Sequence, residues 1–205
     1  TEFYIMTPKA LNDKCKEILH ELSSPEFMSK IEELTGIDNL VYNQQLRGAG
    51  VHKISKDGLL ATHSDFNMYT DEKFGIVDRR INILIYLNKD WKEEYGGHLQ
   101  LFDQNLKSFK KILPILNRCV IFSTTNKSLH GHPYPLKCPE NRVRQSIANY
   151  YYTQNPSSDE ITKAKDFEGD TLHSTLFYDV INNDKTPYEW DGTQYVHNLK
   201  YTIKN

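Results

Sequence analysis

"RRINILIYLN", residues 79–88, is the clearest β-strand signal in the chain. Its apolar residues recur at every second position, which is the period of a strand rather than of a helix. A wholly apolar face packs on a core, whereas a mixed face is typical of a pocket wall. We therefore expect a sheet with a core on one side and a pocket on the other. The apolar face would carry Ile81, Ile83, Ile85 and Leu87, and the mixed face Arg80, Asn82, Leu84 and Tyr86.

Short apolar runs on either side of this stretch predict further strands. Loops rich in Asn, Asp, Pro and Gly separate these runs, and no long helical pattern interrupts residues 40–153, so the sheet should be mainly antiparallel. The region predicts a mainly β fold, either a sandwich or a barrel. The runs are "LVYNQQLRGAGVHKI" (40–54), "GLLATHSDF" (58–66), "GGHLQLF" (96–102), "RCVIFST" (118–124) and "VRQSIANYYYT" (143–153).

Two helices are expected before the strands. The first should cover residues 8–22, with Thr7 as its cap and a proline at its first position. The second should cover residues 25–34, with Ser24 as its cap and Gly36 as its stop signal.

The region after residue 154 has weaker patterns. "DTLHSTLFYDVI" (170–181) predicts one more strand, while the last twenty residues show no core pattern. "KSFKK" (107–111) is typical of a solvated hairpin edge.

Composition and charge exclude some classes of function. The chain has 205 residues, and 25 Lys and Arg face 27 Asp and Glu, so the basic excess typical of nucleic-acid binding is missing. Three cysteines without a CxxC pair indicate reduced thiols, and we expect a cytoplasmic protein. No signal peptide is visible and no apolar run approaches membrane-spanning length, so no membrane partner is expected. No oligomeric state is predicted.

Three residues suggest a metal site. His63 and Asp65 are two positions apart on a predicted strand, so both side chains would point to the same face. His130 follows the later strand "CVIFST" in what we expect to be a loop rich in Gly and Pro. Two imidazoles and one carboxylate form the facial triad of non-haem Fe(II) oxygenases. His132 is an alternative to His130 as the second histidine.

A basic residue downstream suggests an organic cosubstrate. Arg144 and Ser146 share one face of the strand that follows, and a guanidinium with a hydroxyl suits an anchored dicarboxylate. Tyr86 could add its phenol hydroxyl from the mixed face of its own strand. Together with the triad, these residues predict Fe(II) and 2-oxoglutarate. Arg142 is an alternative anchor.

The motifs also resemble a known family. "GLLATHSDFN", "DRRINILIYLNKDWKEEYGGHLQLFD", "ILPILNRCVIFSTTNKSLHGHPYPLKCP" and "RVRQSIANYYYT" follow the order and spacing of iron- and 2-oxoglutarate-dependent dioxygenases of the prolyl 4-hydroxylase-like superfamily, most closely its microbial and phage-type members. The resemblance covers about residues 40–153. It implies a double-stranded β-helix, which is a jelly-roll or cupin-like barrel. Residues 1–154 would form the helical lead-in and the barrel, and 155–205 an extension on the same domain.

The resemblance assigns roles to single residues. His63, Asp65 and His130 would hold the iron, Arg144 would anchor 2-oxoglutarate, and Tyr86 would assist it. It implies dioxygen as the oxidant and ascorbate as an optional reductant. The substrate would be a prolyl residue of a protein or peptide, hydroxylated with release of succinate and CO2.

Other hypotheses stay open at this point. The substrate could instead be a free amino acid or small metabolite, the barrel could be a non-catalytic binding module, or the enzyme could be a metal-dependent cupin without 2-oxoglutarate. Residues 66–79 are expected to form a lid. For Arg79 and Arg80, structural salt bridges at the start of a strand are favoured over the steering of an acidic substrate.

Overall fold

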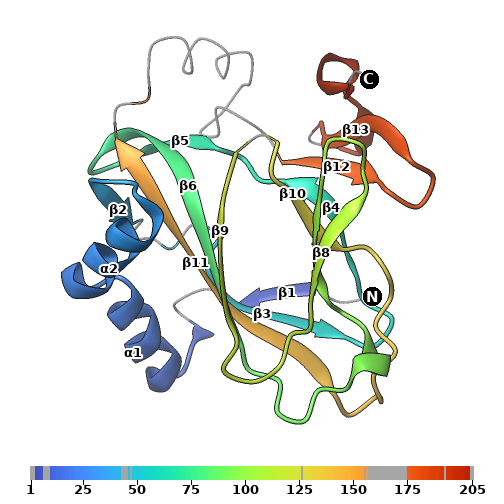
Figure 1. Ribbon diagram of the computed structural model, residues 1–205, viewed down its shortest axis with the longest axis horizontal. Helices are drawn as coiled ribbons and strands as arrows, with labels where there is room; N and C mark the ends of the chain where they lie inside the picture. The colour runs from blue at the N-terminus through green and yellow to red at the C-terminus, as the bar shows by residue number, and fades with distance from the viewer. Residues whose placement is uncertain are drawn as a thin grey trace.

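Two antiparallel sheets face each other in the computed structural model (Figure 1). The structure describes residues 3–6, 10–42, 46, 48–125, 127–154, 156, 175–191 and 193–203. The first sheet has the order β1-β3-β11-β6-β5, with β2 also paired to β11 and β9 to β6. The second has the order β14-β13-β12-β4-β10-β7-β8. Two facing sheets of this topology form the predicted double-stranded β-helix.

The strands of the first sheet are β1 (Phe3–Met6), β2 (Leu40–Tyr42), β3 (Gly50–Ser55), β5 (Met68–Asp71), β6 (Gly75–Tyr86), β9 (Cys119–Ser123) and β11 (Val143–Gln154). Those of the second are β4 (Leu60–Ser64), β7 (Leu99–Phe102), β8 (Ser108–Ile112), β10 (Leu129–His132), β12 (Leu176–Asp179), β13 (Asp184–Trp190) and β14 (Tyr195–His197).

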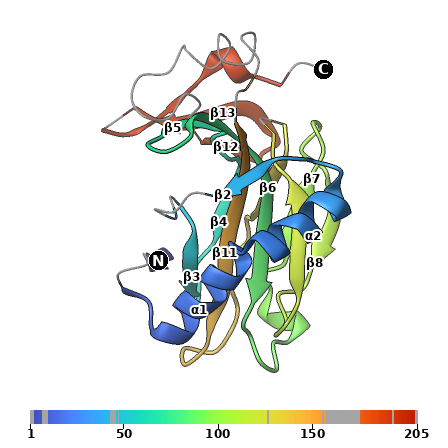
Figure 2. The ribbon, with the colours of Figure 1, turned by 90° about the vertical axis from the view of Figure 1, so that its left-hand side faces the viewer.

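Two helices cover the outer face of the first sheet (Figure 2). The second, α2 (Pro25–Thr35), begins after the Ser24 cap and ends at Gly36 in a left-handed conformation, which confirms the prediction. The first, α1 (Asp13–Leu22), begins five residues later than predicted because Asn12 caps it by accepting a hydrogen bond from the Cys15 amide. Thr7 and Pro8 lie outside the described residues.

The two faces of β6 have the predicted characters over most of its length. Ile81 and Ile83 are fully buried and pack with Ile31 of α2 and Tyr151 of β11. Asn82 is buried on the opposite side, between the two sheets. The apolar face of one strand therefore joins the helices to the barrel, while its mixed face lines the interior.

Several sequence predictions were wrong in detail. Residues 66–79, expected to form a lid, contain β5 and the start of β6, which form an antiparallel hairpin, and their role as a lid stays a prediction. The region around His130 is not a loop but strand β10, which has only four residues and contains a glycine. Turn-forming residues around so short a strand hide its periodicity. The edge predicted at 107–111 is confirmed, since β8 ends the second sheet.

The C-terminal region extends the second sheet. Within the strand predicted at 170–181, residues Leu176–Asp179 form β12, which pairs with β4, and residues 170–174 lie outside the described part. β13 and β14, which the sequence did not predict, continue the sheet beyond β12. They lie on the side of the barrel away from the helices (Figure 1). The division of the chain at residue 154 stays a prediction.

Two simpler expectations can be compared with the structure. All three cysteines are free thiols. Among the described helices, none has the length and apolar character needed to span a membrane.

Ile83→Ala should lower the free energy of unfolding by about 3 kcal/mol, because it leaves a cavity between the sheet and α2. Leu34→Ala is the control. Leu34 lies on α2 and is 69% exposed, so its truncation should lower the free energy of unfolding by less than about 0.5 kcal/mol. Urea unfolding monitored by circular dichroism measures both. Equal losses in the two variants would contradict the assigned core.

Candidate metal centre

His63 and His130 face each other across two neighbouring strands. In the antiparallel pairing of β4 with β10 they are direct partners, and their ring centroids lie 4.4 Å apart. Asp65 follows β4 by one residue, and all three side chains are buried. One potential ligand atom from each residue lies within 4.8 Å of the others. The structure therefore brings together the three residues that the sequence singled out.

Backbone carbonyls orient both imidazole rings. His63 Nδ1 lies 2.8 Å from the Ala61 carbonyl oxygen, and His130 Nδ1 lies 3.0 Å from that of Ser128. A carbonyl can only accept, so Nδ1 carries the proton and Nε2 keeps its lone pair. The two Nε2 atoms lie 3.5 and 3.6 Å from the Asp65 carboxylate oxygens. This tautomer is the one that a metal requires, so the residues fit an iron ion.

Burial keeps His130 neutral. Burial, assisted by the nearby His63, lowers the pKa of His130 to about 4. A neutral imidazole is the metal-binding form of histidine.

Two donors position the Asp65 carboxylate. Asn82 Nδ2 donates to Asp65 Oδ2 at 2.8 Å, and Arg79 Nη1 lies 3.1 Å from the same oxygen. Burial acts to raise the pKa of Asp65, but the charge of the Arg79 guanidinium holds it well below its usual value. The carboxylate is therefore ionised and held in place.

The sequence predicted a salt bridge for Arg79 but not the inward position of its side chain beside the candidate metal centre. By strict alternation it would share the outer face with Ile81, but the register between β6 and β11 shifts between Ile81 and Arg79. This β-bulge leaves Arg80 as the extra residue and turns Arg79 inward. Its guanidinium lies between Phe66 and Tyr150, 3.9 Å from each ring centroid. The favoured role of Arg79, a structural salt bridge, is therefore confirmed by its ion pair with Asp65, but this pair is buried beside the candidate ligands.

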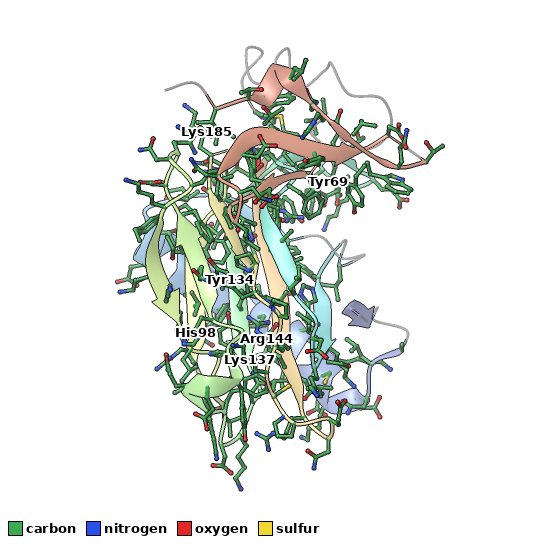
Figure 3. The ribbon with its side chains drawn as sticks, turned by 90° about the vertical axis from the view of Figure 1, so that its right-hand side faces the viewer. Tyr69, His98, Tyr134, Lys137, Arg144 and Lys185 are labelled. Atoms are coloured by element: carbon green, nitrogen blue, oxygen red, sulfur yellow. The ribbon has the colours of Figure 1, made fainter. Side chains whose placement is uncertain are left out.

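A cavity between the two sheets, here called the central cavity, contains the candidate ligands. From β11, Arg144 and Ser146 also line it. Arg144 lies in the part of the barrel farther from the C-terminal strands (Figure 3). Arg142 does not line this cavity, and its guanidinium donates to the Lys89 carbonyl.

Three contacts hold Arg144 in place. Its Nε donates to the Gly97 carbonyl at 2.8 Å, its Nη2 lies 3.5 Å from Tyr86 Oη, and its guanidinium lies 5.1 Å from the Tyr86 ring centroid. Gly97 has a φ of 70°, and a Cβ there would lie 2.9 Å from Arg144 Cδ and 2.5 Å from Leu136 Cδ2. Only glycine allows this close approach. Ser146 pairs with Tyr86 in the sheet register, so the three predicted anchor residues are neighbours.

His132 also lines the central cavity but is not part of the cluster of potential metal ligands. Its ring is buried, and neither ring nitrogen has a hydrogen-bond partner in the described structure.

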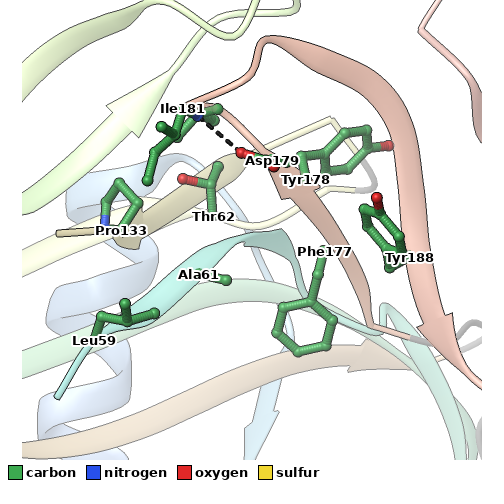
Figure 4. A pocket seen from close by; sticks show the side chains of 10 residues that line it. Leu59, Ala61, Thr62, Pro133, Phe177, Tyr178, Asp179, Ile181 and Tyr188 are labelled. Carbon is green, nitrogen blue, oxygen red and sulfur yellow. Dashed lines mark hydrogen bonds between the residues drawn. The ribbon is translucent and has the colours of Figure 1, made fainter. Parts of the chain in front are cut away.

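An apolar groove lies next to this site (Figure 4). Phe177 and Tyr188 from the C-terminal strands line it together with Leu59, Pro133 and Ile181. Phe177 pairs with His63, and the two ring centroids lie 5.6 Å apart. The groove and the candidate metal ligands are therefore immediate neighbours.

Arg79→Met should lower the free energy of unfolding by about 3–5 kcal/mol, because it leaves the Asp65 carboxylate buried without its cation. Adding Asp65→Asn should recover part of the loss, since the uncompensated charge is then removed. Urea unfolding measures both effects.

Arg80→Met is the matched control for this prediction. The Arg80 side chain is 40% exposed and lies 3.8 Å from Asp78, so the control should cost under about 1 kcal/mol. Equal losses for Arg79→Met and Arg80→Met would contradict the role given to Arg79.

Comparison with known protein families identifies one to which this chain is similar. The model of the 2OG-Fe(II) oxygenase superfamily matches residues 49–152, which is half of the chain. The comparison with curated proteins gave no match.

Similar solved structures include a Pseudomonas putida prolyl-4-hydroxylase, with 15% identity, 75% of this chain and 72% of that chain covered, and a TM-score of 0.48. A Trichoplax adhaerens prolyl hydroxylase in complex with a hypoxia inducible factor peptide fragment has 20% identity, coverages of 73% and 61%, and a TM-score of 0.44. HygX from Streptomyces hygroscopicus, with nickel and 2-oxoglutarate bound, has 13% identity, coverages of 85% and 80%, and a TM-score of 0.46. Because the family model matches half of its length, the chain belongs to the 2OG-Fe(II) oxygenase superfamily and is a dioxygenase that uses Fe(II) and 2-oxoglutarate.

Proposed function

We propose that this dioxygenase hydroxylates a C–H of a prolyl residue in a protein or peptide. Iron would be held by His63, Asp65 and His130, and 2-oxoglutarate by Arg144 with Tyr86 and Ser146. One observation carries the proposal: the three potential ligands and a buried arginine line the same cavity.

The candidate ligands suit ferrous iron chemically. Two imidazoles and one carboxylate are the ligand set of non-haem Fe(II) oxygenases. When bound, iron and 2-oxoglutarate supply the oxidising chemistry, in which dioxygen is consumed, succinate and CO2 are released, and a C–H becomes an alcohol. Arg79 and Asn82 keep the Asp65 carboxylate oriented. The two sheets keep the ligands buried, which excludes bulk water from them.

Arg144 supports the proposed anchor. It is a buried cation, and no carboxylate of the described residues forms an ion pair with it. A buried charge without a partner is costly, so the cavity favours an anion. Burial raises the pKa of Tyr86, so its hydroxyl keeps its proton and can donate to such an anion. The far carboxylate of 2-oxoglutarate would meet both groups.

The prolyl substrate is supported by the sequence motifs and by the groove beside the site. An aromatic-lined groove is the surface type that docks proline-containing segments. A small-molecule substrate is the second candidate. The similar structures favour neither, because they include prolyl hydroxylases and also HygX with hygromycin B bound.

The wild-type protein, incubated with Fe(II), 2-oxoglutarate and air, should form succinate from 2-oxoglutarate. Ascorbate should sustain this reaction as a reductant. His63→Ala should release only background amounts, because one imidazole ligand is lost. Liquid chromatography of succinate measures the difference. Equal succinate from both proteins would rule out the proposed metal centre.

Mass spectrometry tests the substrate class. Proline-containing peptides should gain one oxygen atom only when 2-oxoglutarate is present, and the same peptides with alanine in place of proline should gain none. Oxidation of free amino acids, with unchanged peptides, would replace the prolyl proposal by the small-molecule one.

A further inference from the structure

His132 has a fixed position beside the candidate metal centre. It ends the short strand β10, two residues after His130, and both rings line the central cavity. Between them, a Cβ on Gly131 would lie 2.8 Å from the backbone oxygens of Leu60 and Ala61. β10 therefore lies close against β4, which carries His63, and its last residue lines the central cavity.

The hydrogen bonds of His132 are not satisfied by the described chain. The residue is 2% exposed, and neither Nδ1 nor Nε2 has a hydrogen-bond partner on another described residue. Imidazole carries at least one N–H in every protonation state, so this ring always has a donor. A buried donor without an acceptor costs about 1–3 kcal/mol. His63 and His130 differ, because each directs Nδ1 to a backbone carbonyl.

The surroundings of His132 indicate what kind of acceptor it would meet. Arg144 and Ser146 line the same cavity, and the charge of Arg144 acts on the His132 ring. A guanidinium, a hydroxyl and an imidazole N–H can each donate a hydrogen bond to a carboxylate oxygen. Because Arg144 makes the cavity favour an anion, a carboxylate bound at Arg144 would lie in the same cavity as His132.

We propose that His132 donates a hydrogen bond to the far carboxylate of 2-oxoglutarate and acts as a third binding residue beside Arg144 and Ser146. This inference rests on the proposed function, since it needs 2-oxoglutarate in the central cavity. It gives His132 a binding role distinct from the metal-ligand role considered for it as an alternative to His130.

The experiment is calorimetric titration of ligands into the Mn(II)-loaded protein, since Mn(II) suits nitrogen and oxygen ligands and turnover is not needed. His132→Leu should weaken 2-oxoglutarate binding at least about tenfold, which is the loss of a hydrogen bond to a charged group. His132→Gln keeps an N–H donor, so its dissociation constant for 2-oxoglutarate should stay within about threefold of the wild-type value. His98→Gln is the control, since His98 lies outside the cavity and pairs with Glu93.

A second ligand separates binding from structure. In 2-oxopentanoate a methyl group replaces the far carboxylate, so wild type and His132→Leu should bind it equally. A purely structural role for His132 would weaken both ligands together and would overturn the inference. If His132→Leu does not fold, His132→Met replaces it in the comparison. The inference then predicts that His132→Gln retains the affinity for 2-oxoglutarate and that His132→Met loses it.

The outcomes also separate the inference from the proposed function. Wild-type protein that binds Mn(II) but not 2-oxoglutarate would overturn both. Wild type and His132→Leu that bind 2-oxoglutarate equally would overturn only the role of His132, and a water molecule would then be the acceptor.

Discussion

The antiparallel pairing of β4 with β10 is the contact on which the site depends. It places His63 directly opposite His130, although the two residues are far apart in the chain. Gly131 permits the close approach of the two strands, and backbone carbonyls within the same segments turn each ring. A slip of one residue would move one imidazole to the other face of the sheet, so the register of one short strand decides whether the cluster exists.

Buried charge is the second constraint on this barrel. Asp65 and Arg79 are both buried and form an ion pair, and the Arg79 guanidinium lies between the rings of Phe66 and Tyr150. Arg144 is buried as well, but its contacts are a carbonyl and a phenol rather than a carboxylate. The Asp65 end of the cavity thus has its charges compensated by the protein, whereas the Arg144 end favours a bound anion. This asymmetry suits a cavity that holds a metal at one end and a carboxylate at the other.

The C-terminal strands also contribute to the site. β12 pairs with β4, the strand that carries His63, and Phe177 packs against the His63 ring. The same strands line the apolar groove next to the cluster. A region whose sequence patterns are weaker than those of residues 40–153 therefore forms one side of the surroundings of the candidate metal centre.

Local patterns in the sequence were sufficient for the elements and for most of the site. The period of residues 79–88 predicted a strand with a core face and a pocket face, Ser24 and Gly36 predicted the limits of α2, and the HxD pair placed His63 and Asp65 on one face. Each of these signals is contained within a few neighbouring residues, because strand and helix periods are properties of the backbone itself.

Only the tertiary structure decided the inward turn of Arg79, the strand character of the His130 segment and the unmet hydrogen bonds of His132. A bulge exists only relative to the strand opposite, and a buried donor lacks a partner only relative to everything packed around it. Neither the bulge nor the missing hydrogen-bond partner can be predicted from the sequence, because both depend on which distant segments become neighbours after folding.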